Sequence, residues 1–190
     1  MKGSVFIATS LDGFIARPDG GIEWLPHGTT EDHGYNDFIA TVDAIVMGRH
    51  SYEKVLTFDK WYYGATRVVV LSSRPIPPAP PGADVHHLSG TPDAVAAELD
   101  RRGIHRAYID GGVTIQRFLR AGLIDRIIIT RIPVLLGQGI PLFGELAGDI
   151  LLDHVATRSW PSGLVQSEYR VKEPRAESRE PRAESREPGA

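Results

Sequence analysis

The chain has 190 residues, a formal net charge of −3 at pH 7 and no cysteine. A slightly acidic chain is not expected to bind nucleic acid, and a chain without cysteine has neither disulfides nor a thiolate metal site. No apolar run approaches the roughly 20 residues that a membrane helix needs, and no signal peptide is recognisable, so we expect a cytoplasmic protein.

The C-terminal segment 173–190 differs in composition from the rest of the chain. It repeats EPRAESR at 173–179 and 180–186 and contains no Val, Ile, Leu or aromatic residue. Without the four Arg and five Glu of this segment, the formal net charge is −2. Since such a composition cannot bury a core, we predict one domain over residues 1–172 and a disordered tail over 173–190.

Strand-like and helix-like segments alternate along residues 1–172. Strands are predicted over 5–8, 43–47, 67–71, 106–110, 126–132, 150–157 and 164–171. Helices are predicted over 29–41 and 51–56, from a Thr91 cap to a Gly103 stop, and after Gly111-Gly112. Strands that alternate with helices favour right-handed crossovers and a mostly parallel sheet. We therefore predict a three-layer α/β domain whose last two strands, joined by a short turn, form an antiparallel edge.

Three of the predicted strand ends carry residues suited to phosphate. The first is Gly48, followed by Arg49, His50 and Ser51, whose amides would be free donors at a helix start. The second is Leu71-Ser72-Ser73-Arg74, where two hydroxyls and a guanidinium suit a phosphate monoester. The third is Asp110-Gly111-Gly112-Val113-Thr114, where paired glycines allow a pyrophosphate to approach the backbone.

Each of these segments could also be an ordinary turn or polar loop. Together they match what NADPH requires, because a diphosphate needs helix N-termini and a 2′-phosphate needs a separate cationic pocket. The G-x-G-x-x-G fingerprint of the Rossmann fold is nevertheless missing after the first strand. The pattern therefore points to a different fold.

Segments 46–53, 71–74 and 109–112 resemble, in order and spacing, the cofactor segments of the dihydrofolate reductase fold. Segments 10–13 and 133–143 resemble one branch of that fold. This branch is the reductase domain of the bifunctional riboflavin-biosynthesis deaminase–reductase, with its stand-alone relatives. The resemblance covers residues 2–171 and implies NADPH-dependent hydride transfer to a small pteridine-like or pyrimidine-like heterocycle.

The resemblance also implies roles for individual residues. Residues 48–51 would hold the diphosphate and adjoining ribose, and residues 72–74 would hold the adenosine 2′-phosphate. Gly111 and Gly112 would pack against the diphosphate and nicotinamide ribose, with a cis peptide bond between them. Ala8 and Phe14 would approach the nicotinamide.

The sequence departs from the family pattern in two places. In dihydrofolate reductases a carboxylate that contacts the pterin closely follows a Trp-x-Leu-Pro-like segment, whereas here Trp24-Leu25-Pro26 is followed by His27-Gly28. The zinc-binding deaminase motif is absent, as the lack of cysteine requires. A genuine dihydrofolate reductase and a non-catalytic nucleotide-binding protein therefore remain as alternatives.

Reduction also needs a proton donor and a substrate cleft. Asp12 is the first candidate for the acid because it follows the first strand, although Asp12-Gly13 could simply form a turn. Trp24, Asp32 and Gly139 are the candidate substrate-binding residues, although Asp32 could equally be a helix cap and Trp24 ordinary packing. We predict no metal site, and a homodimer is a further expectation from the family.

Overall fold

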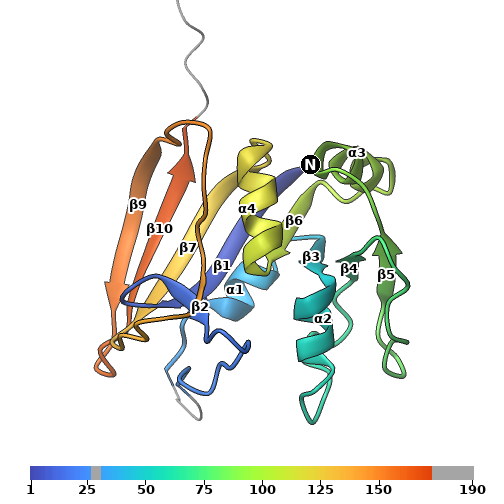
Figure 1. Ribbon diagram of the computed structural model, residues 1–190. Helices are drawn as coiled ribbons and strands as arrows, with labels where there is room; N and C mark the ends of the chain where they lie inside the picture. The colour runs from blue at the N-terminus through green and yellow to red at the C-terminus, as the bar shows by residue number, and fades with distance from the viewer. Residues whose placement is uncertain (27–30, 173–190) are drawn as a thin grey trace, which may run out of the picture.

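The computed structural model describes residues 1–26 and 31–172 (Figure 1). The strands are β1 (Lys2–Ser10), β2 (Phe14–Ala16), β3 (Ala44–Gly48), β4 (Val68–Leu71), β5 (Val85–Leu88), β6 (Arg106–Asp110), β7 (Ile124–Ile132), β8 (Ile140–Pro141), β9 (Leu152–Ser159) and β10 (Val165–Val171). The helices are α1 (Tyr35–Ile39), α2 (Arg49–Val55), α3 (Pro92–Arg101) and α4 (Gly112–Arg120). The predicted tail lies outside the described residues.

The main sheet has the strand order β5-β4-β3-β6-β1-β7-β10-β9. The first six strands of this order are parallel, whereas β10 runs antiparallel to β7 and β9 runs antiparallel to β10. The predicted mostly parallel sheet with an antiparallel C-terminal edge is confirmed. A small second sheet, in which β2 pairs with β8, was not predicted because both strands are too short to show alternation.

Alternating residues of the central strands build one core on each face of the sheet. Val46 and Ile109 pack with Ile115 of α4 and Leu99 of α3. Their sequence neighbours point to the other face, where they pack with Phe38 of α1 and Tyr52 of α2. Figure 1 accordingly shows α4 in front of the sheet and α1 behind it. Two-sided burial explains the continuous apolar runs of these strands and confirms the three layers.

Helix α1 differs from its prediction. Its described part begins at Tyr35 and ends at Ile39, whereas the helix was expected over 29–41, of which residues 29 and 30 lie outside the described residues. Asp32 Oδ1 accepts a hydrogen bond from the Gly34 amide at 2.8 Å. Residues 32–34 therefore form a tight turn, and the helix begins only after it. Helix α3 begins as predicted, because Thr91 Oγ1 accepts from the Ala94 amide.

The predicted cis peptide bond between Gly111 and Gly112 is wrong, because every peptide bond of the described residues is trans. Gly111 turns the chain through its own backbone angles instead, with φ of 85° and ψ of 132°. Only glycine adopts this region without strain. Among residues 1–26 and 31–172, no helix combines the length and apolar character needed to cross a membrane.

Candidate active site

The carboxyl ends of three parallel strands lie level with one another. Gly48 pairs with Leu71, and Met47 pairs with Asp110. The three segments that the sequence suggested for phosphate therefore meet at one edge of the sheet. We call residues 48–51, 71–74 and 110–114 the cofactor edge.

Two glycines allow α2 and α4 to begin side by side at this edge. A β-carbon on Gly111 would lie 2.3 Å from Ser51 Oγ, and one on Gly48 would lie 3.0 Å from Thr114 Oγ1. A side chain at Gly111 would therefore displace Ser51. The glycines that suggested a ligand contact also have this packing role.

The first turns of α2 and α4 keep free backbone donors. Neither helix has a side-chain cap, since each follows a glycine. Helix α3, which follows β5, is by contrast capped by Thr91. The first amides of a helix have no partner within it, so those of α2 and α4 can bind an external anion.

Two arginines stand beside these donors. Arg49 Nε donates to Glu53 Oε1 at 2.6 Å, and Arg49 Nη1 donates to the Pro75 carbonyl at 3.0 Å. Arg49 chiefly, with a weaker contribution from Arg74, lowers the pKa of the Glu53 carboxyl. Ser72 Oγ accepts from the Arg74 amide at 3.0 Å, so Ser72 shapes the turn that presents Arg74. The side chains of His50, Ser73 and Val113 face solvent.

Asp110 belongs to the cofactor edge by its backbone, but its side chain lies on the face of the sheet that α1 covers. It follows Tyr108 by two positions on β6, and Tyr108 packs in the core of that face. Tyr108 Oη donates to the Phe6 carbonyl at 2.8 Å and lies 3.4 Å from Asp110 Oδ1. Burial raises the pKa of the Asp110 carboxyl, although hydrogen bonds from the Gly111 amide and the Tyr108 hydroxyl oppose this rise. Burial thus makes ionisation of this carboxyl less favourable than in water.

Two further tyrosine hydroxyls lie near this carboxyl. Burial raises the pKa of the Tyr35 and Tyr63 hydroxyls, and the nearby charge of Asp110 adds to both shifts. The Tyr35 ring lies 6.0 Å from that of Tyr62, which in turn lies 5.7 Å from Tyr63. We call Tyr35, Tyr63, Tyr108 and Asp110 the tyrosine cluster. Sequence reasoning missed these tyrosines, because they come from three segments and show no common spacing.

Asp12 makes contacts of a different kind. Its carboxylate accepts hydrogen bonds from the Leu136 amide at 3.1 Å and from the Gly137 amide at 2.8 Å. A hydrogen bond with Ser10, followed by those from the two amides, lowers the pKa of the Asp12 carboxyl, which is exposed. Asp12 also lines a groove of about 400 Å³ with Arg131 and Phe143. An ionised carboxylate with these partners anchors the loop, and its role as an acid stays a prediction.

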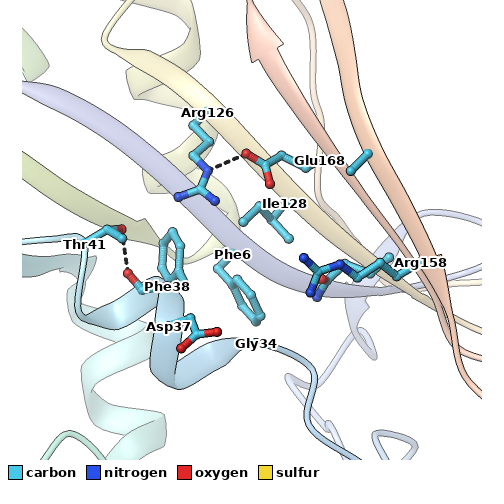
Figure 2. A pocket seen from close by; sticks show the side chains of 11 residues that line it. Phe6, Gly34, Asp37, Phe38, Thr41, Arg126, Ile128, Arg158 and Glu168 are labelled. Atoms are coloured by element: carbon cyan, nitrogen blue, oxygen red, sulfur yellow. Dashed lines mark hydrogen bonds and ion pairs between the residues drawn. The ribbon is translucent and has the colours of Figure 1, made fainter.

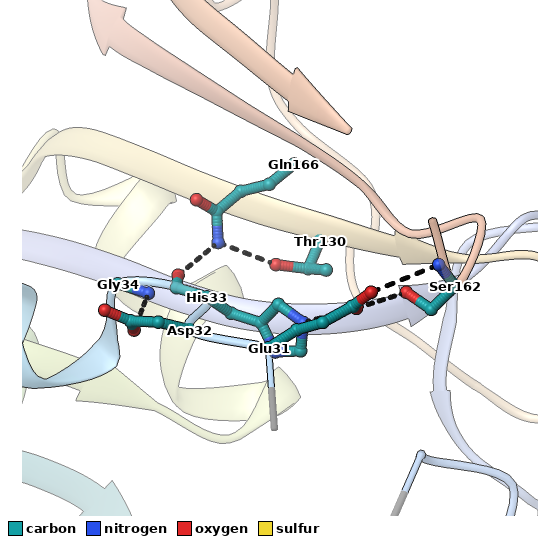
Figure 3. Close-up of polar contacts among 7 residues, drawn as sticks. All are labelled: Glu31, Asp32, His33, Gly34, Thr130, Ser162 and Gln166. Atoms are coloured by element: carbon teal, nitrogen blue, oxygen red, sulfur yellow. Dashed lines mark hydrogen bonds and ion pairs between the residues drawn. The ribbon is translucent and has the colours of Figure 1, made fainter. Parts of the chain in front are cut away.

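The predicted substrate residues lie at separate points. The indole Nε1 of Trp24 is buried and has no hydrogen-bond partner within the described residues. Asp32 is exposed and holds the turn before α1, as Figure 3 shows. A β-carbon on Gly139 would lie 2.4 Å from the Ala16 carbonyl and 2.9 Å from Phe14, so Gly139 packs against β2. Ala8 is half-buried in β1, opposite Thr130 of β7.

A polar network holds the segment before α1 against the sheet (Figure 3). Gln166 Nε2 donates to the His33 carbonyl at 3.0 Å and to Thr130 Oγ1 at 2.9 Å. Glu31 accepts from the amide and hydroxyl of Ser162. These contacts fix the start of α1, which contributes Tyr35 to the tyrosine cluster.

The comparisons with known proteins agree with this architecture. The family model of the RibD C-terminal domain matches residues 2–165, so the chain belongs to that family. The uncharacterized protein YwjB of Bacillus subtilis is 39% identical over 163 residues, which cover 84% of this chain and 92% of YwjB.

Solved structures extend the comparison. A protein from Shewanella sp. PV-4, provisionally assigned to riboflavin biosynthesis, is 40% identical with a TM-score of 0.83, over 91% of this chain and all of that one. Dihydrofolate reductase from Enterococcus faecalis, solved in complex with NADP(H), is 18% identical with a TM-score of 0.65, over 90% of this chain and 97% of that enzyme. The second likeness shows that the fold is that of dihydrofolate reductase.

Proposed function

We propose that this member of the RibD C-terminal domain family is an NADPH-dependent reductase of a small pyrimidine-like or pteridine-like heterocycle. One observation carries the proposal. A buried carboxyl of raised pKa, Asp110, directly precedes the glycine turn at which the uncapped helix α4 begins. A proton source and an anion-binding edge thus occupy the same turn, as a reductase needs.

The residues of the cofactor edge fit NADPH. The amides of residues 49–51 and 112–114 would hold the diphosphate, because both helices begin there without side-chain caps. Arg74, presented by the Ser72 turn, would bind the 2′-phosphate, with Arg49 beside it. Ala8 and Phe14 remain the proposed contacts of the nicotinamide. When bound, NADPH supplies the hydride.

Asp110 is the proposed source of the proton. Reduction of a C=N or C=C bond adds a hydride to one atom and a proton to the other, and the proton needs a donor that is protonated at working pH. Burial beside Tyr108 raises the pKa of Asp110 and so disfavours its ionised form, whereas the contacts of Asp12 favour ionisation. The tyrosine rings would also offer flat surfaces to a heterocycle.

Trp24, Asp32 and Gly139 remain the proposed substrate contacts. Trp24 has the clearest reason, since its buried indole donor has no partner among the described residues and would bind an acceptor on the heterocycle. Gly139 would act through the position of β2, against which it packs. Asp32 would act through the turn that precedes α1.

The proposal is tested in two steps with the full chain. Titration with NADPH, followed by cofactor fluorescence, should give saturable binding, and absence of binding at millimolar NADPH would refute the proposal. A panel of pyrimidines, pteridines and dihydrofolate is then assayed by loss of NADPH absorbance. Turnover of any pyrimidine or pteridine supports the reductase, whereas binding of NADPH without turnover of any compound supports a nucleotide-binding protein.

A further inference from the structure

A small cavity lies outside the proposed active site. It sits over β1, β7 and β10, between α1 and the edge strand β9, and has a volume of about 180 Å³ (Figure 2). None of the residues proposed to bind cofactor or substrate lines it. Its charged lining residues are Asp37, Arg126, Arg158 and Glu168. Its chemistry therefore needs an explanation of its own.

Arg126 is held in place on one side of this cavity. Its Nε donates to Glu168 Oε1 at 2.8 Å, and its guanidinium carbon lies 5.8 Å from the centroid of the Phe38 ring. Figure 2 shows the two terminal nitrogens of Arg126 directed past Phe38 into the cavity. Within the described residues they have no hydrogen-bond partner. Two preoriented donors are thus available to a ligand.

Arg158 approaches from the other side. It lies on β9 opposite Gln166 of β10, and Figure 2 shows its guanidinium turned toward the rings of Phe6 and Phe38. It forms no ion pair with any described residue. Two guanidinium groups that face one cavity repel each other, and an oxyanion between them would remove that repulsion.

The remaining lining limits the shape and charge of a ligand. Phe6 and Phe38, with ring centroids 4.9 Å apart, provide an apolar wall. Glu168 is neutralised by Arg126, so the unpaired charges are the cation of Arg158 and the anion of Asp37. A matching ligand carries a carboxylate toward the arginines and a hydrogen-bond donor toward Asp37. The volume admits one ring.

We propose that this cavity binds an aromatic carboxylate of a single ring that carries a hydroxyl or amino donor. The inference does not depend on the reductase assignment. Phe38 connects the two places, because its ring lies 5.2 Å from that of Tyr108 as well as close to Arg126. A ligand here therefore lies one ring away from Tyr108 of the tyrosine cluster.

Isothermal titration of the full chain with 4-hydroxybenzoate is the test. We expect saturable binding at millimolar or lower concentration, and no binding of 4-hydroxybenzyl alcohol, which keeps the ring and hydroxyl but lacks the charge. Arg158→Gln should weaken binding about 10-fold or more, as expected for a lost charge-assisted hydrogen bond. Arg131→Gln is the matched control, because Arg131 lies on β7 but lines the groove near Asp12 instead.

Arg126 is tested in a variant that leaves no unpaired charge. Arg126→Gln alone would strand Glu168, so Arg126→Gln/Glu168→Gln is used, with circular dichroism to verify folding. Loss of binding in this folded variant and in Arg158→Gln supports the proposal. The proposal is overturned if 4-hydroxybenzoate does not bind, if the alcohol binds equally well, or if Arg131→Gln weakens binding as much as Arg158→Gln.

Discussion

The cofactor edge and the tyrosine cluster meet at Asp110, yet they are built differently. The cofactor edge consists of three short contiguous segments, each at the end of a parallel strand, and its donors are mainly backbone amides. The tyrosine cluster consists of side chains from α1, β6 and the loop after α2. Local sequence determines the residues of the cofactor edge, whereas the tertiary fold brings the tyrosine cluster together. Asp110 belongs to both, so variants near it can separate the two contributions.

The largest expected effect is that of Asp110→Asn on turnover. The amide keeps the shape but cannot deliver a proton, so kcat should fall about 10²- to 10⁴-fold, the usual contribution of a general acid. NADPH binding should be unchanged, because Asp110 belongs to the cofactor edge only by its backbone, whereas its side chain lies on the face that α1 covers. A variant that keeps full turnover would show that the proton comes from elsewhere.

Asp110 also predicts a pH dependence for the wild-type protein. Because the acid must be protonated, activity should fall as pH rises through the raised pKa of Asp110. Stability should follow the same direction. The contribution of a group whose pKa is raised on folding is fully present below its unfolded pKa and is lost as pH rises through the folded pKa. Asp110→Asn should therefore lose both the alkaline decline in kcat and this part of the stability change, which rate profiles and denaturant unfolding at several pH values would measure.

Gly111→Ala tests the packing of the cofactor edge. The substitution places a β-carbon at φ of 85° and 2.3 Å from Ser51 Oγ. Backbone strain of about 1–3 kcal/mol and overpacking of about 1–3 kcal/mol should lower the free energy of unfolding, as measured with denaturant. Gly111→Ala/Ser51→Ala removes only the overpacking and should recover part of the loss. No recovery would mean that backbone conformation alone requires glycine.

Much of this fold could be predicted from the sequence, because its parallel strands are short apolar runs separated by helices. The Thr91 cap and the antiparallel C-terminal edge were also evident from local residues. The extent of α1 was not, since residues 31–34 are held by contacts with Ser162 and Gln166, far away in the sequence. β5 was not predicted as a separate strand, because His86 and His87 dilute its apolar pattern.

The candidate site also has a part that could be predicted from the sequence and a part that could not. Spacing at strand ends suggested residues 48–51, 71–74 and 110–114, and the structure places them at one edge. The environment of Asp110 could not be predicted, because burial among Tyr35, Tyr63 and Tyr108 exists only in the folded chain. The sequence therefore suggested Asp110 as a cofactor contact and Asp12 as the acid.

Arg74→Gln should have a smaller effect, confined to the cofactor edge. If Arg74 binds the 2′-phosphate, the loss of one charge-assisted hydrogen bond should raise the Kd of NADPH about 10-fold and leave that of NADH unchanged. Fluorescence titration with both cofactors measures the difference. Arg106→Gln is the control, because Arg106 begins β6 and lies at the end of that strand away from the cofactor edge. Equal weakening of NADPH and NADH would show that Arg74 does not distinguish them.

Asp12→Asn should have the smallest effect on turnover, because Asp12 contacts neither the cofactor edge nor the tyrosine cluster. Its carboxylate holds the amides of Leu136 and Gly137, and its lowered pKa means that this contribution is present above the ordinary pKa of Asp and is lost as pH falls through the folded value. Amide proton shifts of Leu136 and Gly137, followed by NMR, should therefore titrate below the usual range for Asp in the wild-type protein and not in the variant. Asp19→Asn, whose carboxylate accepts from the Gly21 amide, is the matched control. If Asp12→Asn instead abolishes turnover while Asp110→Asn does not, Asp12 is the acid, and the raised pKa of Asp110 reflects burial without catalysis.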